Sequence, residues 1–365
     1  MRPIRLLIVD DSVFMRKAYD RFLKTKEINI VAMAKNGKEG VEKTIELKPD
    51  IVIMDIEMPI MNGLDALDII MKSIPTPVLM VSSQTSEGAD ATLDALQRGA
   101  VDFVAKENSF IQAGDMQDEI ISKIITIGRN SNIKNKVLRN SLIRKDFLEN
   151  GIIPSENIKQ TKPSIKNSKD KINRPKPSEI NALVIGISTG GPLALQSLIP
   201  KLPANFPAPI FIIQHMPPNF TQSLANRLNS LSALHVKEAE DGDVYKAGNV
   251  YIAPGGKQML VGNSSITIRE HIPEDKLYKP SFDVALEHLN KVFGRKLLAV
   301  VMTGMGHDGA IGLKKLSENG GYCIGQDPST CVVSGMVNSA EKVGAVNEIC
   351  ELDKIAQLLI QIFKL

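Results

Sequence analysis

The stretch Ile4–Lys17, IRLLIVDDSVFMRK, holds an apolar run that ends at two adjacent aspartates and leads into an amphipathic segment. An apolar run followed by a helical pattern is typical of a strand–helix unit. The unit recurs along the first part of the chain. Strands are expected at 4–9, 30–34, 51–54, 78–81 and 101–104, and helices at 12–24, 38–47, 63–71, 87–98 and 116–127. This alternation predicts an α/β domain with a doubly wound, mainly parallel sheet.

The composition changes after residue 128. Residues 129–179 are rich in Asn, Ser and Pro and hold 13 Lys or Arg against 5 Asp or Glu, while the whole chain has a net charge of only +3. Such a segment buries too little apolar surface to offset the entropy of ordering. We predict a flexible basic linker here, in which Val137–Leu148 also fits a short helix. Because the basic excess lies in this linker, the charge does not favour a nucleic-acid partner.

The alternation resumes in the second half and predicts a second α/β domain over 180–365, after a first domain over 1–128. Strands are expected at 182–187, 210–214, 250–253 and 297–302, with a hairpin at 258–261 and 266–269 around Gly262-Asn263. Helices are expected to begin near Pro192, Phe220, Phe282, Asp308, Ser334 and Leu352.

Composition excludes several other classes of protein. The three cysteines are odd in number and lack CxxC spacing, which argues against a disulfide framework or a cysteine-rich zinc site and fits a reducing cytoplasm. The first apolar run, Ile4–Val9, is too short for a signal peptide, and no apolar run is long enough to span a bilayer. We therefore expect a cytoplasmic protein without membrane insertion.

Acidic side chains mark the ends of the first and third predicted strands. Asp10 and Asp11 follow the first, and Asp55 follows the third. The carboxyl ends of parallel strands share one edge, and three carboxylates there repel one another unless a hard cation such as Mg²⁺ lies among them. Lys106 and Ser82 follow the fifth and fourth strands, and the set suits phosphoryl transfer to Asp55. The alternative is that each aspartate merely caps a helix.

A serine motif opens the second half. Gly186–Gly191, GISTGG, follows an apolar strand and precedes Pro192, so Ser188 is predicted on a sharp turn before a helix. The spacing fits the G-x-S-x-G pattern of a serine nucleophile, and backbone N–H groups there can stabilise an oxyanion. The motif alone is weak, and a phosphate-binding loop or a plain turn is the alternative.

A serine nucleophile needs a base and a group that orients the base. Among five histidines, His215 ends the next strand and can share the edge of the sheet with Ser188. His235 is expected in a polar connection, His271 and His288 in exposed charged stretches, and His307 is a weaker candidate. Asp308 follows a very apolar strand and can hold the tautomer of His215.

The first domain resembles the receiver domain of two-component response regulators. The segments that carry the resemblance are LLIVDDSVFMRK, IVIMDIEMPIMNGLDAL and VLMVSSQTSEGADATLDALQRGAVDFVAK. It implies a flavodoxin-like fold, phosphorylation of Asp55, and Mg²⁺ held by Asp10, Asp11, Asp55 and the backbone around Glu57. Ser82 and Lys106 match the switch hydroxyl and the lysine of the family. Receivers usually have Pro after this lysine, whereas this chain has Glu107.

The second domain resembles the catalytic domain of CheB methylesterases, a Rossmann-like serine esterase. The matching segments are VIGISTGGPLAL, IFIIQHMPPNFTQSLANRL, AEDGDVYKAGNVYIAPGG, KPSFDVAL, VVMTGMGHDGAIGL and STCVVSGM. The resemblance implies a catalytic triad of Ser188, His215 and Asp308, with Thr189 and the backbone of Met305 near the oxyanion. The family often has His where this chain has Gln258, which leaves substrate preference more open than the chemistry.

The resemblance also implies a function and partners. The expected reaction is hydrolysis of glutamate methyl esters on cytoplasmic helices of chemoreceptors, with glutamine deamidation by the same route and no cofactor at the esterase site. A chemotaxis histidine kinase is the expected phosphodonor, and the unphosphorylated receiver is expected to restrain the esterase. The rivals are a receiver that only targets the enzyme, a response regulator whose second domain only binds a partner, and a DNA-binding output domain.

Overall fold

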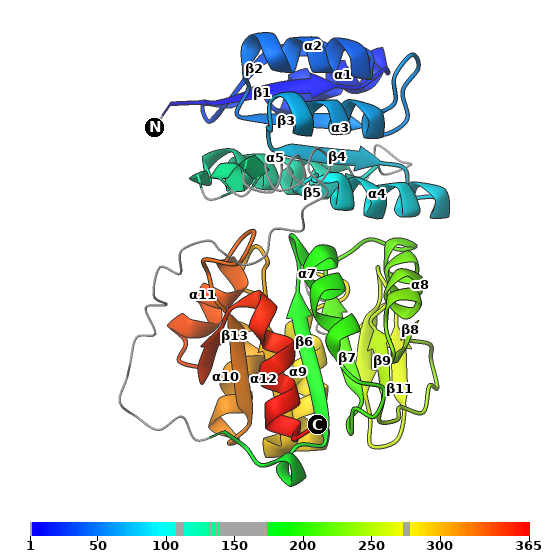
Figure 1. Cartoon of the computed structure of the whole chain (residues 1–365), viewed down its shortest axis with the longest axis vertical. Coiled ribbons are helices and arrows are strands. Elements are labelled where there is room, and N and C mark those ends of the chain that lie inside the picture. Colours follow the sequence, from blue (N-terminus) through cyan, green and yellow to red (C-terminus); the bar gives the residue numbers. More distant parts are fainter. Residues whose placement is uncertain (1, 107–112, 132, 136, 139–173, 273–277) are drawn as a thin grey trace, which may run out of the picture. The chain divides into compact units, whose positions relative to one another are not determined.

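The computed structural model describes residues 2–106, 113–131, 133–135, 137–138, 174–272 and 278–365. The chain divides into two compact units, each built around its own parallel sheet (Figure 1). Two α/β units with parallel sheets confirm the predicted fold class. Within the described ranges, no helix has both the length and the apolar character that crossing a bilayer requires.

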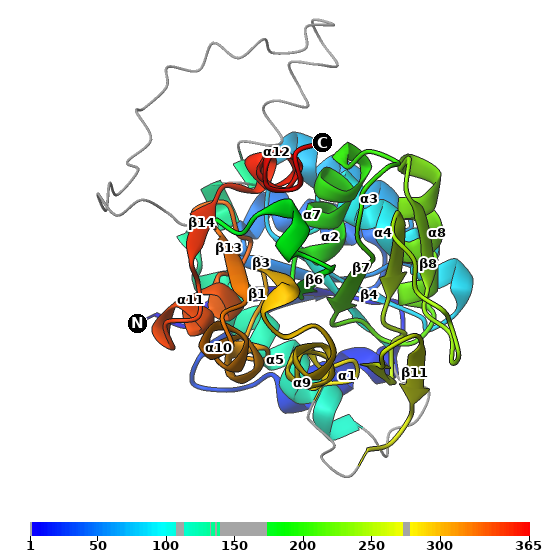
Figure 2. The ribbon, with the colours of Figure 1, turned by 90° about the horizontal axis from the view of Figure 1, so that it is seen from below.

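The first unit has a five-stranded parallel sheet in the order β2-β1-β3-β4-β5. The strands are β1 (Ile4–Val9), β2 (Ile28–Ala34), β3 (Ile51–Asp55), β4 (Val78–Ser82) and β5 (Asp102–Ala105). The helices are α1 (Val13–Phe22), α2 (Gly37–Leu47), α3 (Gly63–Ser73), α4 (Ser86–Arg98) and α5 (Ala113–Arg129). Figure 2 shows α2, α3 and α4 over one face of this sheet and α1 and α5 over the other. All five predicted strands and helices are therefore present.

Short polar side chains fix where three of these helices begin. Ser12, Asn36 and Asn62 each accept a hydrogen bond from a backbone N–H of the first helical turn. Such caps satisfy donors that have no partner within the helix. Asp10 and Asp11 therefore stay in the loop between β1 and α1, at the carboxyl edge of the sheet.

The chain remains ordered past the predicted end of the first domain. Residues 131, 133–135 and 137–138 are helical, and Ile133 and Val137 are buried. Lys134 Nζ lies 2.6 Å from Asp50 Oδ1, in an ion pair with the loop before β3. The first residues of the predicted linker thus pack on the first unit. Residues 139–173, with most of the linker and of the alternative helix Val137–Leu148, lie outside the described residues.

The second unit has a seven-stranded sheet in the order β14-β13-β12-β6-β7-β9-β8, with every neighbouring pair parallel. The strands are β6 (Ala182–Ile187), β7 (Ile210–Gln214), β8 (His235–Glu238), β9 (Asn249–Ile252), β12 (Leu297–Val301), β13 (Tyr322–Gln326) and β14 (Glu348–Cys350). An antiparallel hairpin of β10 (Gln258–Val261) and β11 (Ile266–Arg269) is the predicted one. Strand order reverses at β6, with β7 on one side and β12 on the other.

The sequence prediction missed three strands of this sheet. β8 and β14 are the two edge strands, and both are short and partly exposed, so neither shows a continuous apolar run. β13 is buried but contains Gly325 and ends in Gln326, which interrupts the apolar pattern. The placement of His235 in a polar connection was wrong, because His235 is the first residue of β8.

Six α-helices among the described residues of the second unit cover its sheet. They are α7 (Gly191–Leu198), α8 (Phe220–Leu231), α9 (Phe282–Phe293), α10 (Ala310–Glu318), α11 (Gly335–Lys342) and α12 (Leu352–Phe363), with 3₁₀ turns at Pro177–Glu179, Ile199–Lys201 and Gly294–Lys296. Figures 1 and 2 show α7 and α12 on one face and α9 and α10 on the other. The helix expected near Asp308 begins only at Ala310, because Gly309, at φ 94°, is its N-cap. Asp308 therefore remains in the loop.

The start of α9 packs directly on the central strand. A Cβ at Gly186 or Gly309 would lie 2.1 or 2.2 Å from the ring of Phe282, so only glycine fits at either position. Phe282 is fully buried and is the first residue of α9. This close approach brings the N-terminus of α9 to the loop that carries Asp308.

Candidate functional sites

Three adjacent parallel strands carry the three residues predicted to form a triad. Ser188 follows β6, His215 follows β7, and Asp308 lies in the loop after β12. The order β12-β6-β7 places all three loops at the carboxyl edge of the sheet, where strand order reverses. Open α/β sheets bind ligands at this position.

His215 and Asp308 form a direct pair across this edge. His215 Nε2 lies 2.8 Å from Asp308 Oδ2, and the two side chains are 9% and 5% exposed. Since a carboxylate accepts, His215 is assigned as the tautomer that carries its proton on Nε2. The other ring nitrogen, Nδ1, is buried and has no hydrogen-bond partner among the described residues. Nδ1 is thus the nitrogen with a lone pair to accept a proton.

Asp308 is held by the start of α9 as well as by His215. Its carboxylate accepts from Ser281 Oγ at 2.9 Å and from the backbone N–H groups of Phe282 and Asp283 at 2.6 and 3.0 Å. Burial alone would raise the pKa of Asp308. The hydrogen bond and charge of His215, with those two N–H groups, outweigh burial and hold this pKa below 3.8. The carboxylate is therefore ionised and fixed at neutral pH.

The turn that bears Ser188 is tightly packed. The N–H of Ser188 donates to Thr303 O at 2.9 Å, and Ser188 O accepts from the N–H of Gly191 at 2.8 Å. Gly190 adopts φ 75° and is the N-cap of α7, which has Pro192 in its first turn. These features confirm the predicted sharp turn between a strand and a helix.

The loop that contains Met305 lies against this turn. A Cβ at Gly304 would come within 2.8 Å of Ser188 Cβ, so the backbone before Met305 packs on the candidate nucleophile. Thr189 is buried, and its carbonyl accepts from Thr303 Oγ1 at 2.9 Å. Both residues named for oxyanion support therefore lie in segments that contact each other beside Ser188.

A buried amide that the sequence analysis did not single out connects the segments of Ser188 and His215. Gln214 is 1% exposed, and its Nε2 donates to Ser188 O at 3.0 Å and to His215 O at 3.1 Å. A Cβ at Gly191 would lie 1.9 Å from Gln214 Oε1, which explains the glycine there. A glutamine at the end of a fully apolar strand was the signal in the sequence.

The remaining histidines do not compete as bases. His235, His271 and His307 are exposed, and His288 lies within α9, six residues after its first residue Phe282. His307 is next to Asp308 in sequence, but among the described contacts the histidine that pairs with Asp308 is His215.

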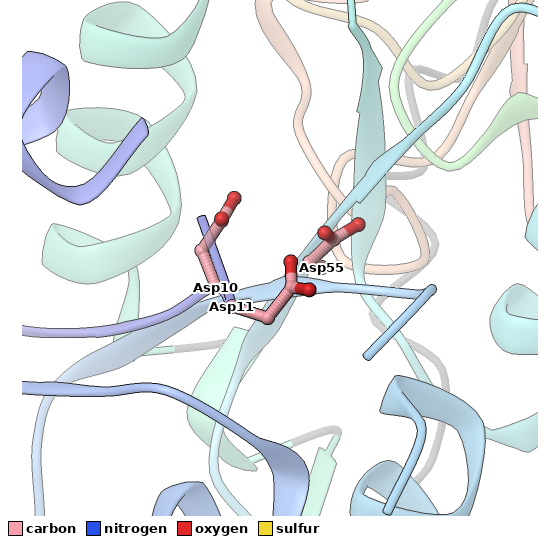
Figure 3. A group of neighbouring side chains, drawn as sticks. All are labelled: Asp10, Asp11 and Asp55. Atoms are coloured by element: carbon pink, nitrogen blue, oxygen red, sulfur yellow. The ribbon is translucent and has the colours of Figure 1, made fainter. Parts of the chain in front are cut away.

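The first unit gathers acidic side chains at the carboxyl edge of its own sheet. One carboxylate oxygen from each of Asp10, Asp11 and Asp55 lies within 4.8 Å of the other two. Figure 3 shows the three side chains as neighbours. Asp10 and Asp55 are buried, whereas Asp11 is exposed. Lys106 Nζ lies 2.5 Å from Asp55 Oδ2 and 3.8 Å from Asp10 Oδ2. The predicted cluster of three carboxylates and one ammonium is present.

This cluster fits a divalent cation. Burial raises the pKa of Asp10 to about 6 and also raises the pKa of Asp55, although Lys106 lowers both. Asp10 Oδ2 has no hydrogen-bond partner among the described residues. Burial and mutual repulsion disfavour the charged form of these carboxylates, and a hard cation among them would offset both effects. Ionised carboxylate oxygens, such as the unpartnered Asp10 Oδ2 would supply, are ligands that Mg²⁺ prefers.

Glu57 and Ser82 flank the cluster. Glu57 has an exposed side chain, and its backbone N–H donates to the carboxylate of Asp55. Ser82 ends β4, is 1% exposed, and its carbonyl accepts from the N–H of Lys106 at 2.7 Å. Glu107, where receivers usually have proline, lies outside the described residues.

Comparison with curated proteins extends over the whole chain. A protein of Bacillus licheniformis is 43% identical over 369 residues, which cover 99% of each chain, and one of Methanococcus maripaludis is 41% identical over 96% of this chain and 95% of its own. Both are named protein-glutamate methylesterase/protein-glutamine glutaminase. The chain belongs to the CheB methylesterase family. The CheB methylesterase domain matches residues 183–359, and the response regulator receiver domain matches residues 6–115.

Solved structures from the same family cover the two parts separately. The CheB methylesterase catalytic domain of Thermotoga maritima is 44% identical, with a TM-score of 0.47. The match covers 50% of this chain and 98% of the Thermotoga chain. The response regulator domain of Thermotoga maritima CheB is 46% identical, with a TM-score of 0.34, and covers 36% of this chain and 99% of its own.

Proposed function

We propose that this member of the CheB methylesterase family hydrolyses glutamate methyl esters on the cytoplasmic helices of chemoreceptors, under the control of phosphorylation at Asp55. Deamidation of receptor glutamines would use the same site. An ester has a better leaving group than an amide, so esterase activity is the primary one. The observation that carries the proposal is the 2.8 Å pair of His215 and Asp308 beside the turn of Ser188.

The proposed first step is acyl transfer to Ser188. Its Oγ attacks the ester carbonyl while His215 Nδ1 accepts the hydroxyl proton, and the imidazolium that forms remains hydrogen-bonded through Nε2 to Asp308. The C–O bond to the methoxy group then breaks, and the imidazolium donates its proton so that methanol leaves. Ser188 then carries the glutamyl acyl group as an ester.

The second step releases the product. Water attacks the acyl-enzyme while His215 accepts a proton from it, and the imidazolium returns this proton to Ser188 Oγ as the acyl bond breaks. The glutamate leaves as a free carboxyl group. In both steps backbone N–H groups in the segments of Thr189 and Met305 would stabilise the oxyanion, the role that usually contributes most to such catalysis.

Asp55 is the proposed phosphoacceptor of the first unit. Asp10, Asp11, Asp55 and the backbone around Glu57 would hold Mg²⁺, which would neutralise charge on the incoming phosphoryl group. Lys106, already 2.5 Å from Asp55, would pair with the phosphoryl oxygens, and Ser82 would donate its hydroxyl to them. A chemotaxis histidine kinase is the proposed donor.

Phosphorylation is proposed to relieve a restraint of the receiver on the esterase. A preference of a few kcal/mol between two states is enough to switch most molecules. The alternative is that the receiver only targets the enzyme to its substrate. If the unphosphorylated receiver restrains the esterase, a fragment that begins near Pro177 would be more active than the unphosphorylated full-length chain. Equal activities, unchanged by phosphodonor, would favour targeting instead.

Methanol release from membranes that contain methylated receptors tests the activity. We expect release by the full-length chain, with a rise when acetyl phosphate and Mg²⁺ are added. Release without any rise would remove phosphorylation control but keep the esterase. Absence of release under both conditions would favour a response regulator whose second domain only binds a partner.

A further inference from the structure

An aromatic side chain covers one face of the candidate base. The ring of Tyr278 stacks on the imidazole of His215 with 4.4 Å between the centroids and 4° between the planes. The hydrogen bond to Asp308 fixes Nε2, but one hydrogen bond at one corner leaves the imidazole some freedom to tilt about it. A parallel ring against the face removes this freedom.

The backbone of Tyr278 is itself held by a fully buried amide. Gln258, the first residue of β10, donates from Nε2 to Tyr278 O at 2.9 Å and accepts at Oε1 from the N–H of Ser281 at 2.8 Å. The carbonyl of Lys279, between them, accepts from the N–H of Gly256 at 2.9 Å. Three hydrogen bonds therefore hold residues 278–281 to the first residue of β10 and to the loop before it.

The two ends of this short segment act on the two members of the pair. Tyr278 covers the face of His215, while Ser281 Oγ donates to Asp308 Oδ1 at 2.9 Å. The side-chain amide of Gln258 thus holds both Tyr278 and Ser281 in place. Because it uses one donor and one acceptor, glutamine satisfies both backbone partners without carrying charge.

We infer that Tyr278 is a positioning residue for His215 and that Gln258 sets the place of Tyr278. The stack holds the imidazole in the plane in which Nε2 meets Asp308 and Nδ1 is left for the proton of Ser188. The ring face also stabilises the imidazolium that forms when His215 takes this proton. The inference rests on the proposed function, since it assigns His215 as the base.

The first experiment compares Tyr278→Leu with Tyr278→Phe in methanol release by the full-length protein. Misplacement of a catalytic group costs up to about 100-fold in rate, so we expect Tyr278→Leu to lower kcat about 10- to 100-fold with KM within about 2-fold of wild type. Tyr278→Phe keeps the ring face and should keep kcat within about 3-fold of wild type. Unchanged kcat in Tyr278→Leu, a loss in Tyr278→Phe as large as that in Tyr278→Leu, or a change confined to KM would each overturn the inference.

A second readout does not depend on activity. With ring-labelled histidine, the His215 ring protons should show an upfield ring-current shift in wild type and Tyr278→Phe, and should lose it in Tyr278→Leu. Gln258→Met removes both hydrogen bonds of the amide and should weaken the shift and kcat together. If Gln258→Met does not fold, the comparison of Tyr278→Leu with Tyr278→Phe still tests the inference.

The spectra also separate this inference from the proposed function. Absence of methanol release in wild type would remove the proposed function, whereas the ring-current shift would still report the stack. Methanol release by wild type without the shift would overturn the positioning role alone.

Discussion

His215 contacts Asp308 through Nε2 rather than through Nδ1, at 2.8 Å. The ring nitrogen nearer the backbone, Nδ1, is therefore the one whose lone pair is available, and it is buried without a hydrogen-bond partner among the described residues. A buried acceptor without a partner costs free energy, and the proposed transfer of the Ser188 proton to Nδ1 would explain why this cost is tolerated.

Ser188→Ala is expected to abolish methanol release while the protein stays folded. The hydroxyl is required for the chemistry, and its loss removes little packing. His215→Ala should be comparably severe, because nucleophile and base act as one unit. Methanol release and circular dichroism test both changes, with the exposed His235→Ala as a control for loss of a histidine. Turnover near the wild-type rate in Ser188→Ala would remove the triad assignment.

Asp308→Asn is expected to lower kcat by about 10³- to 10⁴-fold relative to wild type, a smaller loss than in Ser188→Ala. In the proposed mechanism Asp308 orients and stabilises His215 but does not bond to substrate. The amide also places a donor where the carboxylate accepts from Phe282 and Ser281. Loss of charge-assisted hydrogen bonds should lower the free energy of unfolding by about 2–3 kcal/mol. Kinetics and urea unfolding of the full-length chain measure the two effects separately.

The same carboxylate gives a pH dependence of stability. The pKa of Asp308 is held below its unfolded value of 3.8, so the folded state binds fewer protons than the unfolded state near this pH. Its stabilising contribution is present above pH 3.8 and is lost as the pH falls through the folded pKa. The difference in unfolding free energy between wild type and Asp308→Asn should therefore shrink below this pH, and a constant difference would contradict the assignment.

Gln214→Leu should lower kcat about 10- to 100-fold, because Ser188 O and His215 O lose the donor that connects their segments. The buried side chain is replaced by one of similar volume, so the loss is mainly of hydrogen bonds. Gln222→Leu, at an exposed glutamine on α8, is the matched control and should leave kcat unchanged. Equal activity of the two variants would contradict a positioning role for Gln214.

Asp55→Asn and Lys106→Met should keep the basal rate of methanol release and lose the rise on addition of acetyl phosphate. The first variant lacks the proposed phosphoacceptor, and the second lacks its charge partner. The half-buried Asp20→Asn on α1, whose carboxylate pairs with Lys24, should keep the rise. A rise that persists in Asp55→Asn would exclude this residue as the phosphoacceptor.

Limited proteolysis is expected to cut first between residues 139 and 173, where the composition predicts a flexible linker. Ile133 and Val137 are buried on the first unit and Lys134 pairs with Asp50, so cleavage should spare residues up to 138. Mass spectrometry of the early fragments gives the sites. Early cuts within 4–105 or 182–365 would mean that the predicted domain boundaries are wrong.

The sequence by itself determined the two parallel sheets and the candidate residues at their edges. Local patterns carry this information, since buried strands such as β6 and β7 are continuous apolar runs and chemistry-bearing residues follow directly after them. Ser188, His215, Asp10, Asp11 and Asp55 could all be named in this way. The edge strands β8 and β14 were not predicted, because a partly exposed strand of three or four residues has no continuous apolar run.

Only the tertiary structure decided how the candidate residues meet. Asp308 is separated from His215 by 93 positions. The start of α9 holds the Asp308 carboxylate through the N–H of Phe282, where it meets His215 Nε2. Gln214, Gln258 and Tyr278 contact backbone carbonyls, a backbone N–H group and a ring face, and no side-chain pattern encodes these partners. Packing sets these contacts: glycine at 186, 191 and 304 lets chain segments approach within distances that any Cβ would prevent.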